Sequence, residues 1–476
     1  MAPTVMTPAR LTGLAALRWG WRFALDPLMS TRRAFEAFGP YVILAEGLPL
    51  IRPRHVTTLG VPLVLTAGSA FYSELASQSD TWRGVSLLPG GSKKSAAKRM
   101  SSGLMRLTGA QHAHYRKLLV QPLRKSRVET LTKSMARLAE SETASWPLGE
   151  NLDLWEYTRR IIQKFAVEFL FGGRSEQSCA ITELGCRMME RKWDWRAMAF
   201  PINLPITTYG QLVRDADLLE RRMLSWVAAK RGQPDEGDIA SIMANGRDPG
   251  GNPLDHAAIM AQLPSLFGLS SEGGQSVLTW TLLLLMQHPH VAAQLRDELA
   301  SKLGGTSPSL DRAGDLPYLD AVVKEAMRVL PPVPLQFRVA QRDTSIAGQE
   351  MPNGTRAVLN TFLTNRAPDL YPEGDMFRPE RWLTIDPNAF EFPVFGAGPH
   401  ICPGFWFDTA AVKIAVAAIF ARYRMDLPAG TQIDYSTQPT LRPRRRVDVV
   451  LHRADGRMKP PPPVTGKIRE LIKLPQ

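Results

Sequence analysis

The stretch from residue 395 to residue 404 reads Phe395-Gly396-Ala397-Gly398-Pro399-His400-Ile401-Cys402-Pro403-Gly404. Its glycines allow the backbone to approach a flat ligand closely, and a helical pattern begins soon after its single thiol. Backbone N–H groups and the positive end of a following helix stabilise a thiolate. Such a thiolate is a strong axial ligand for haem iron, although a buried free cysteine in a tight turn is the simpler alternative. The stretch favours Cys402 as an iron ligand.

The composition of the whole chain is that of an ordinary globular protein. The 476 residues include 44% hydrophobic and 22% charged residues, and 58 Lys plus Arg against 45 Asp plus Glu give a net charge of +13. These values exclude a disordered tail protein, a collagen and a disulfide-stapled mini-protein. The three cysteines, Cys179, Cys186 and Cys402, form no Cys-x-x-Cys pair. A disulfide framework and a four-thiolate zinc or iron–sulfur site are therefore not expected.

The hydrophobic pattern predicts a mainly α-helical protein with small β-sheets, in the α+β class. Helical patterns dominate from residue 110 to about residue 303, and two later helices are expected at 319–330 and 408–423. Pro331 and Pro332 end the first of these. Residues 339–360 alternate between apolar and polar and indicate a hairpin-like pair of strands.

We expect one large domain over residues 36–455, with a basic leader at 1–35 and a Pro-rich, basic tail at 456–476. The first 25 residues contain three arginines and no acid, which would also suit a transit peptide or a membrane-surface helix. No uncharged apolar run approaches the roughly 18 residues of a spanning helix, so no spanning membrane segment is expected. Without a signal-peptide pattern, the expected location is the cytoplasm.

An acid and a base lie three residues apart in the helix predicted at 319–330. Glu325 and Arg328 share one helical face, and the residues around them are mostly apolar. A solvated surface pair would contribute little, whereas a buried pair needs a further partner. Arg381, in the segment 377–382, is the candidate for that partner.

These pieces, in this order, resemble the cytochrome P-450 superfamily of haem-thiolate monooxygenases. The family's cysteine signature is Phe-x-x-Gly-x-Arg-x-Cys-x-Gly, and Phe395, Gly398, Cys402 and Gly404 match it. The resemblance covers roughly residues 39–450. It implies the cytochrome P-450 fold and haem b, with Cys402 as the proximal iron ligand. It also implies that Glu325, Arg328 and Arg381 form a structural triad, which is not catalytic.

The resemblance also assigns contacts to the haem propionates. His112 and Arg116 match the family's helix with a Trp or His and an Arg four residues apart, a spacing that directs both groups to one side. Arg338 fits a third contact. The family usually has Arg two residues before the cysteine, where this chain has His400. Imidazole can still donate a hydrogen bond to a propionate, but its charge depends on pH.

The sequence departs from the family on the oxygen side. Glu272 takes the position of the acid in the family's long helix, and Gly273 replaces the alcohol that usually follows it. In the family, this pair relays protons to iron-bound dioxygen. Three interpretations remain: a water and Glu272 carry the protons, a substrate hydroxyl supplies the missing group, or the chemistry bypasses the relay. Peroxide use, coupling, dehydration and isomerisation belong to the last class.

The substrate pocket assigned by family position is apolar. It includes Leu269, Val333 and Phe337, together with parts of residues 85–107 and 193–206. Such pockets favour an apolar small molecule, although many of these residues could equally be ordinary core residues. No anchor for a carboxylate is evident, because Arg83, Arg99 and Arg106 lie in a segment expected to be a loop.

Residues 93–137 contain about a dozen Lys or Arg and a single acid, Glu129. No aromatic interleaving or nucleic-acid motif accompanies this run, so binding of nucleic acid is not expected. Docking of an acidic electron donor of the ferredoxin or flavodoxin type is the favoured interpretation, and plain solubilising charge is the alternative. The chain carries no flavin fingerprint or iron–sulfur cysteines of its own, so the donor is external.

The leading functional hypothesis is monooxygenation of an apolar small molecule with O2 and two electrons from an external redox partner. The first alternative is a haem-thiolate enzyme with non-hydroxylating or peroxide-driven chemistry, because Gly273 replaces the usual alcohol. The second alternative is a haem-binding sensor that retains Cys402 but does not activate oxygen.

Overall fold

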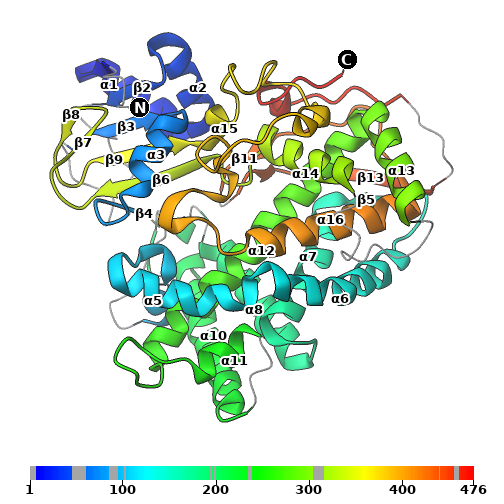
Figure 1. Cartoon of the computed structure of the whole chain (residues 1–476), viewed down its shortest axis with the longest axis horizontal. Helices are drawn as coiled ribbons and strands as arrows, with labels where there is room; N and C mark the ends of the chain where they lie inside the picture. Colours follow the sequence, from blue (N-terminus) through cyan, green and yellow to red (C-terminus); the bar gives the residue numbers. More distant parts are fainter. Residues whose placement is uncertain are drawn as a thin grey trace.

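The computed structural model describes most of the chain (Figure 1). The described residues are 7–44, 61–84, 95–100, 103–192, 194, 196–197, 200–233, 238–303, 316–438, 440–454 and 460–475, and at 105, 239–240 and 263–271 only the backbone is described.

Helices make up most of the described structure. The α-helices are α1 (Gly13–Leu25), α2 (Pro27–Phe38), α3 (Ser69–Ser77), α4 (Ala96–Met100), α5 (Gly109–Val120), α6 (Lys125–Ala144), α7 (Leu154–Phe171), α8 (Glu176–Lys192), α10 (Thr208–Lys230), α11 (Ile239–Asn245), α12 (His256–Gln287), α13 (Pro289–Leu303), α14 (Pro317–Val329), α15 (Thr361–Thr364) and α16 (Phe405–Arg422). The short 3₁₀-helices are η1 (Leu104–Arg106), η2 (Gln121–Leu123), η4 (Pro379–Leu383), η5 (Pro393–Phe395), η6 (Gly398–His400) and η7 (Lys467–Glu470).

The strands form one large sheet and three small ones. The strands are β1 (Ala9–Leu11), β2 (Tyr41–Leu44), β3 (Leu63–Thr66), β4 (Trp82–Gly84), β5 (Asn151–Asp153), β6 (Leu335–Ala340), β7 (Thr344–Ile346), β8 (Gln349–Met351), β9 (Arg356–Asn360), β10 (Tyr423–Asp426), β11 (Tyr435–Ser436), β12 (Arg442–Pro443) and β13 (Asp448–Arg453). The large sheet has the order β1-β2-β3-β9-β6-β4. The small sheets have the orders β10-β13-β5, β11-β12 and β7-β8.

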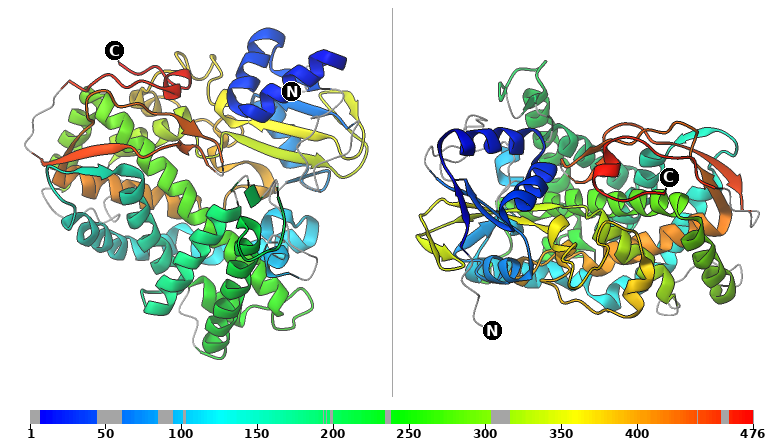
Figure 2. Two further views of the ribbon diagram at one scale, coloured as in Figure 1. Left: turned by 180° about the vertical axis from the view of Figure 1, so that it is seen from behind. Right: turned by 90° about the horizontal axis from the view of Figure 1, so that it is seen from above.

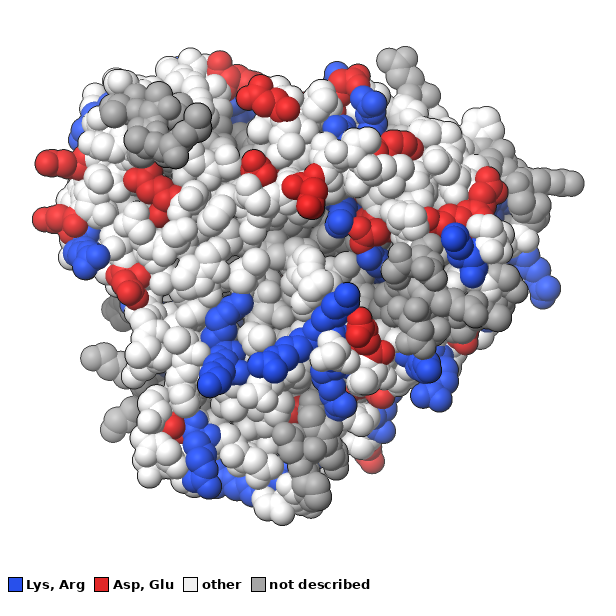
Figure 3. Space-filling view, viewed as in Figure 1, with Lys and Arg blue, Asp and Glu red and all other residues white. Residues whose placement is uncertain are grey.

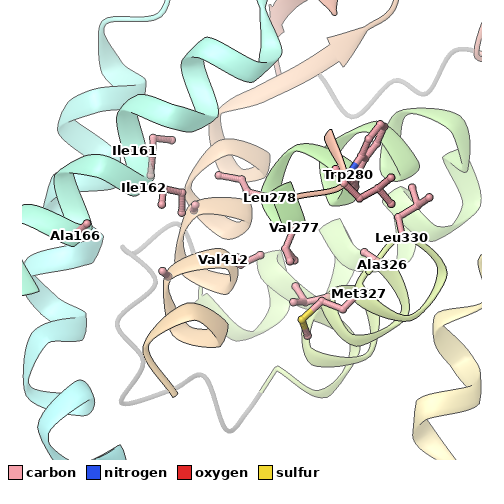
Figure 4. Packing of buried hydrophobic residues seen from close by; sticks show 14 of the residues in the cluster. Ile161, Ile162, Ala166, Val277, Leu278, Trp280, Ala326, Met327, Leu330 and Val412 are labelled. Atoms are coloured by element: carbon pink, nitrogen blue, oxygen red, sulfur yellow. Dashed lines mark hydrogen bonds between the residues drawn. The ribbon is translucent and has the colours of Figure 1, made fainter. Parts of the chain in front are cut away.

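The main core surrounds the long helix α12. This helix packs on α7, α14 and α16, and Figure 4 shows apolar side chains from all four helices meeting there. Val277, Leu278 and Trp280 of α12 are buried, and the Trp280 indole N–H donates to the carbonyl of Leu441 at 2.8 Å. Removal of these apolar surfaces from water holds the four helices in place. α12 is therefore held in a fixed position, and so are the residues along it, Glu272 and Gly273 included.

The large sheet lies at one end of the helical part (Figure 2). A second core cluster, which includes Tyr41, Tyr72 and Trp82, lies between this sheet and α3. The turn η6, which precedes Cys402, contacts α3, while Cys402 itself leads into α16 of the main core. The cysteine loop therefore joins the sheet part to the helical part.

Several predicted elements are present with shifted ends. The helices expected at 319–330 and 408–423 correspond to α14 and α16, and the pattern at 339–360 corresponds to strands β6 to β9. α16 begins three residues earlier than expected, at Phe405, so its first turn lies next to Cys402. The expected loop at 81–108 contains β4, α4 and η1. No helix among the described residues is long and apolar enough to cross a bilayer.

The described parts of the two predicted terminal segments contact the rest of the chain. β1 pairs with β2 in parallel, α2 runs across residue 35, and Phe23 and Leu28 are buried in the main core. In the tail, the Lys473 N–H donates to the carbonyl of Asp375 at 2.9 Å. The described parts of both terminal segments therefore pack on the domain, because apolar residues between their basic ones join its core.

Candidate active site

Cys402 lies between η6 and the first turn of α16. Its backbone N–H donates to the carbonyl of Phe395 at 2.7 Å, which closes the loop, and the backbone N–H of Gly404 interacts with its sulfur. Gly398 has a φ of +68°, and a Cβ added there would lie 2.4 Å from the carbonyl oxygen of Ala76. Only glycine fits this close approach to α3. The conformation of the loop that presents the thiol thus depends on this glycine.

The surroundings of Cys402 disfavour a free thiolate. Burial raises the pKa of the Cys402 thiol to about 12, and the nearby carboxyl of Asp408 also raises it. The N–H of Gly404 and the guanidinium of Arg116 act in the opposite direction. A coordinated metal ion removes the proton from a thiol outright. The sulfur is therefore neutral on its own and becomes a thiolate when a cation binds it.

The structure brings His112, Arg116, Arg338 and His400 together near Cys402. The rings of His112 and His400 lie 4.1 Å apart, and the Nε2 atoms of both are buried without a hydrogen-bond partner in the part of the chain described. Burial, followed by the charges of the neighbouring cations, lowers the pKa of His400 to about 4. His400 is therefore a neutral hydrogen-bonding group near pH 7.

Arg338 is a buried cation with little local compensation. It is 8% exposed, and burial lowers the pKa of its guanidinium. Its hydrogen bonds go to the carbonyl of Phe337 at 3.1 Å and to Gln336 Oε1 at 3.5 Å. Buried cations and N–H groups without an acid partner are unfavourable unless a ligand supplies the anion. This arrangement fits the two propionates of haem b beside the Cys402 sulfur.

Glu325, Arg328 and Arg381 meet as the sequence predicted. Arg328 Nε and Nη2 donate to Glu325 at 2.8 and 2.9 Å, and Arg381 Nε donates to Glu325 Oε1 at 3.0 Å. Trp382 Nε1 and the backbone N–H of Arg378 also donate to this carboxylate. Burial acts to raise the pKa of Glu325, but the hydrogen bond and charge of Arg328 outweigh it and keep the pKa below its usual value.

Glu272 and Gly273 lie on α12, which continues as a helix through both residues. Burial raises the pKa of Glu272 to about 7, with smaller effects from Arg442, Glu190 and Lys192. A Cβ added at Gly273 would meet no atom of the described residues within 4 Å. The acid is therefore partly protonated near neutral pH, and no described atom lies where a side chain at the neighbouring glycine would begin.

Asp408 is a site residue that the sequence reasoning missed. It lies in the first turn of α16, its Oδ1 is buried without a partner among the described residues, and burial raises its pKa to about 8. Cβ atoms built on Gly404 and Gly274 would lie 3.3 and 3.6 Å from its carboxylate oxygens. The approach at Gly404 is tight, whereas the distance at Gly274 is an ordinary contact, so Gly404 is the glycine that leaves room for this carboxyl. An acid in a helix that is otherwise largely apolar was the signal in the sequence.

The proposed pocket residues are only partly placed. The side chain of Leu269 lies outside the described residues, Val333 is 37% exposed, and Phe337 packs edge-on against Phe23 with ring centroids 6.5 Å apart. A cavity of about 340 Å³ is present at the other end of α16, where Leu285, Phe420 and Pro461 are among its lining residues. That cavity is not next to Cys402, so the substrate pocket stays a prediction.

The chain is similar to known cytochrome P450 proteins. The family model for cytochrome P450 matches residues 87–451. Cyclooctatin synthase of Streptomyces melanosporofaciens is 27% identical over 74% of this chain and 79% of its own length. Pentalenene oxygenase of Streptomyces avermitilis is 24% identical over 68% of this chain and 74% of its own length.

Among solved structures, the retinoic acid-bound cyanobacterial CYP120A1 aligns with a TM-score of 0.78 at 23% identity, covering 94% of this chain and all of that one. This similarity confirms the expected fold, and the family match confirms the resemblance drawn from the cysteine, Glu-x-x-Arg and Arg381 motifs. A match to the family model over most of the chain shows that this protein belongs to the cytochrome P450 family of haem b monooxygenases, oxidoreductases that use O2, a small-molecule substrate and an external redox partner.

Proposed function

We propose that Cys402 is the proximal ligand of the haem iron and that the protein monooxygenates an apolar small molecule. The observation that supports this most strongly is the buried thiol beside four nitrogen-bearing side chains that form no ion pair with an acid in the described structure, His112, Arg116, Arg338 and His400. We propose that these four hold the propionates, with Phe395 and Gly404 shaping the loop under the ring. Haem held by a thiolate supplies dioxygen activation and favours O–O cleavage.

Glu272 is the proposed proton carrier. A general acid works best when its pKa is close to the operating pH, and burial brings the pKa of Glu272 to about 7. Gly273 offers no hydroxyl, so a water in the space beside it, or a hydroxyl of the substrate, completes the path to the oxygen side. Leu269, Val333 and Phe337 are proposed to line the apolar pocket.

The electron donor is proposed to be an acidic ferredoxin or flavodoxin that docks on a basic face. We define the basic face as Lys117, Arg124, Lys125, Lys133 and Arg137, which are exposed on α5 and α6 and on the turn between them. Lys125 Nζ lies 5.5 Å from the ring centre of Trp406, in the turn directly after Cys402. Figure 3 shows Lys and Arg gathered over this region. A cytoplasmic location stays a prediction.

Labelling with heavy-isotope dioxygen tests the proposed reaction. The protein is supplied with an acidic ferredoxin, its reductase and NADPH, together with a compound that shifts the spin state of the ferric protein. Monooxygenation predicts one labelled oxygen atom in the product. An unlabelled product would favour the non-hydroxylating alternative, and no substrate-stimulated NADPH oxidation would favour the haem-binding sensor.

The variant Gly273→Thr separates the interpretations of the missing alcohol. If water replaces the hydroxyl, the threonine raises the yield of product per NADPH without changing the product. If a substrate hydroxyl occupies the space, the added side chain abolishes activity. Gly274→Ala is the matched control, because it adds a side-chain carbon to the next residue of the helix but no hydroxyl. A Cβ at Gly274 makes an ordinary contact at 3.6 Å, and a Cβ at Gly273 meets no described atom within 4 Å.

A further inference from the structure

Three cations from three separate segments lie near one another beside α12. Arg83 belongs to β4, Arg106 ends η1, and Lys192 ends α8. β4 contacts η1, and both η1 and α8 pack on α12. Burial is the main cause that lowers the pKa of Arg106 and of Lys192, and the charge of Arg83 adds to it at Arg106 and the charge of Arg106 at Lys192. Arg106 is therefore within electrostatic reach of both other cations.

The position of Arg106 is fixed by the turn that carries it. The backbone N–H of Leu104, two residues earlier, donates to Gln262 Oε1 of α12 at 2.8 Å. Both Leu104 and Gln262 are buried. Arg106 therefore lies on a defined turn, and the segment expected from the sequence to be a loop can hold a charged group in place.

These cations have no acid partner in the described structure. None of Arg83, Arg106 and Lys192 makes a hydrogen bond or ion pair through its side chain there, although Lys192 is only 9% exposed. By contrast, nearby Arg99 makes two hydrogen bonds to Glu220, at 2.7 and 2.6 Å. Burying an ammonium group without an acid partner costs free energy. The position of Lys192 beside two further cations therefore needs an explanation.

Asp194 and Glu272 are close to Lys192, but neither pairs with it in the described structure. Asp194, close to Lys192 in the chain, already pairs with Arg196 at 2.6 Å. Glu272 raises the pKa of Lys192 but forms no ion pair with it within the described residues. Among the described residues no carboxylate pairs with the cluster, and a ligand anion can take that place.

The cluster is distinct from the group of residues near Cys402. Arg83 pairs with Val339 across the β4–β6 ladder, while Arg338 pairs with Gly84. Because side chains alternate along a strand, Arg83 lies on the same sheet face as Phe337 and on the opposite face from Arg338. Arg83 and the proposed propionate contact Arg338 therefore face different sides of the sheet, and Phe337 is one of the residues assigned to the substrate pocket.

We propose that Arg83, Arg106 and Lys192 bind a carboxylate of the substrate, so that the substrate is an apolar molecule carrying an acid group. This rests on the proposed monooxygenase function and narrows its substrate class. Guanidinium and ammonium groups make strong, charge-assisted hydrogen bonds to carboxylate oxygens. Glu272 would repel the anion when it is ionised, which places the acid group of the substrate on the Arg106 side of Lys192.

Matched acids and esters test this proposal. The ferric protein is titrated with dodecanoic acid, hexadecanoic acid and retinoic acid, each beside its methyl ester, and the spin-state shift gives the Kd. We expect at least one acid to bind about tenfold or more tightly than its ester, the size of one charge-assisted hydrogen bond. Arg106→Gln should remove that preference and leave the Kd of the ester unchanged.

Arg99→Gln is the matched control, because it removes a cation of the same region that already has a carboxylate partner, and it should retain the preference. The proposal is overturned if no acid of the panel binds more tightly than its ester, or if Arg106→Gln weakens acid and ester equally. The reduced, CO-bound spectrum of each protein is recorded in parallel. If the parent protein shows the thiolate spectrum but does not prefer the acid over the ester, only this proposal is rejected. If the parent protein does not show the thiolate spectrum, the proposed function is rejected as well.

Discussion

At the scale of single residues, the site contains groups whose charge state is set by burial. Burial raises the pKa values of Cys402, Asp408 and Glu272 and lowers that of His400. Cys402 could be identified from the sequence because its neighbours are glycines and prolines at fixed spacing. Asp408 had a signal, as an acid in a largely apolar helix, but its burial could not be predicted, because its carboxylate packs near Gly274, a residue distant in the chain.

The raised pKa of Asp408 makes stability depend on pH. The pKa of Asp408 is near 3.8 in the unfolded chain and about 8 in the folded protein. At a pH between these two values, the folded state binds a proton that the unfolded state has lost. Stability therefore falls as pH rises through this window. Asp408→Asn removes the effect, so its free energy of unfolding should exceed that of the parent by more at pH 8 than at pH 5. Urea denaturation at both pH values measures this difference.

Asp320→Asn is the control for that comparison. Burial acts to raise the pKa of Asp320, but Lys413 and Lys324 outweigh it and keep the pKa below 3.8. Its stabilising contribution is present above the unfolded pKa, so Asp320→Asn should lower stability by similar amounts at pH 5 and pH 8. An Asp408→Asn difference that is the same at both pH values would show that Asp408 is not held protonated.

At the scale of elements, the site is assembled where α12, α14, α16 and the segment with η4 meet. Periodicity and proline stops predicted α14 and α16, and the i,i+3 spacing of Glu325 and Arg328 predicted their pairing. The pairing of β1 with β2 could not be predicted, because a three-residue strand carries almost no periodic signal. The same limit hid η1, and with it the fixed position of Arg106.

The Glu325 carboxylate is expected to stabilise the junction of α14 and η4 most strongly. It accepts hydrogen bonds from Arg328, Arg381, Arg378 and Trp382, and both Glu325 and Arg328 are 0% exposed. Glu325→Gln leaves a buried guanidinium without its counter-charge, which costs about 3–5 kcal/mol. Trp382→Phe removes one neutral donor to the carboxylate and should cost about 1.5–3 kcal/mol. Thermal unfolding of the two variants gives the comparison, and equal losses would contradict the central role of Glu325.

At the scale of the whole molecule, the cysteine loop lies between the sheet part and the helical part, with the basic face beside it (Figures 1 and 3). Net charge and the basic run at 93–137 are visible in the sequence, but the contact between Lys125 and Trp406 is not, because it joins residues 281 positions apart. Folding brings that charge close to the residue proposed to hold the iron.

Docking through the basic face predicts a rate that depends on salt. Reduction of the ferric protein by an acidic plant-type ferredoxin should slow steeply as ionic strength rises, because salt screens exposed charges. Lys125→Glu should lower the rate at low salt and flatten the salt dependence. Lys467→Glu, an exposed lysine of η7, is the control and should behave as the parent does. A flat salt profile in the parent protein would exclude docking by charge.

The most direct test of the account is the absorption spectrum of the dithionite-reduced protein with carbon monoxide. Thiolate ligation by Cys402 predicts a strongly red-shifted Soret band that is lost in Cys402→Ala. Cys186→Ser is the control. Cys186 lies on α8 and its sulfur accepts a hydrogen bond from Gln163 of α7 at 3.0 Å, so this variant should leave the band unchanged. A Soret band typical of histidine ligation, or an unchanged band in Cys402→Ala, would contradict the assignment of Cys402 as the iron ligand.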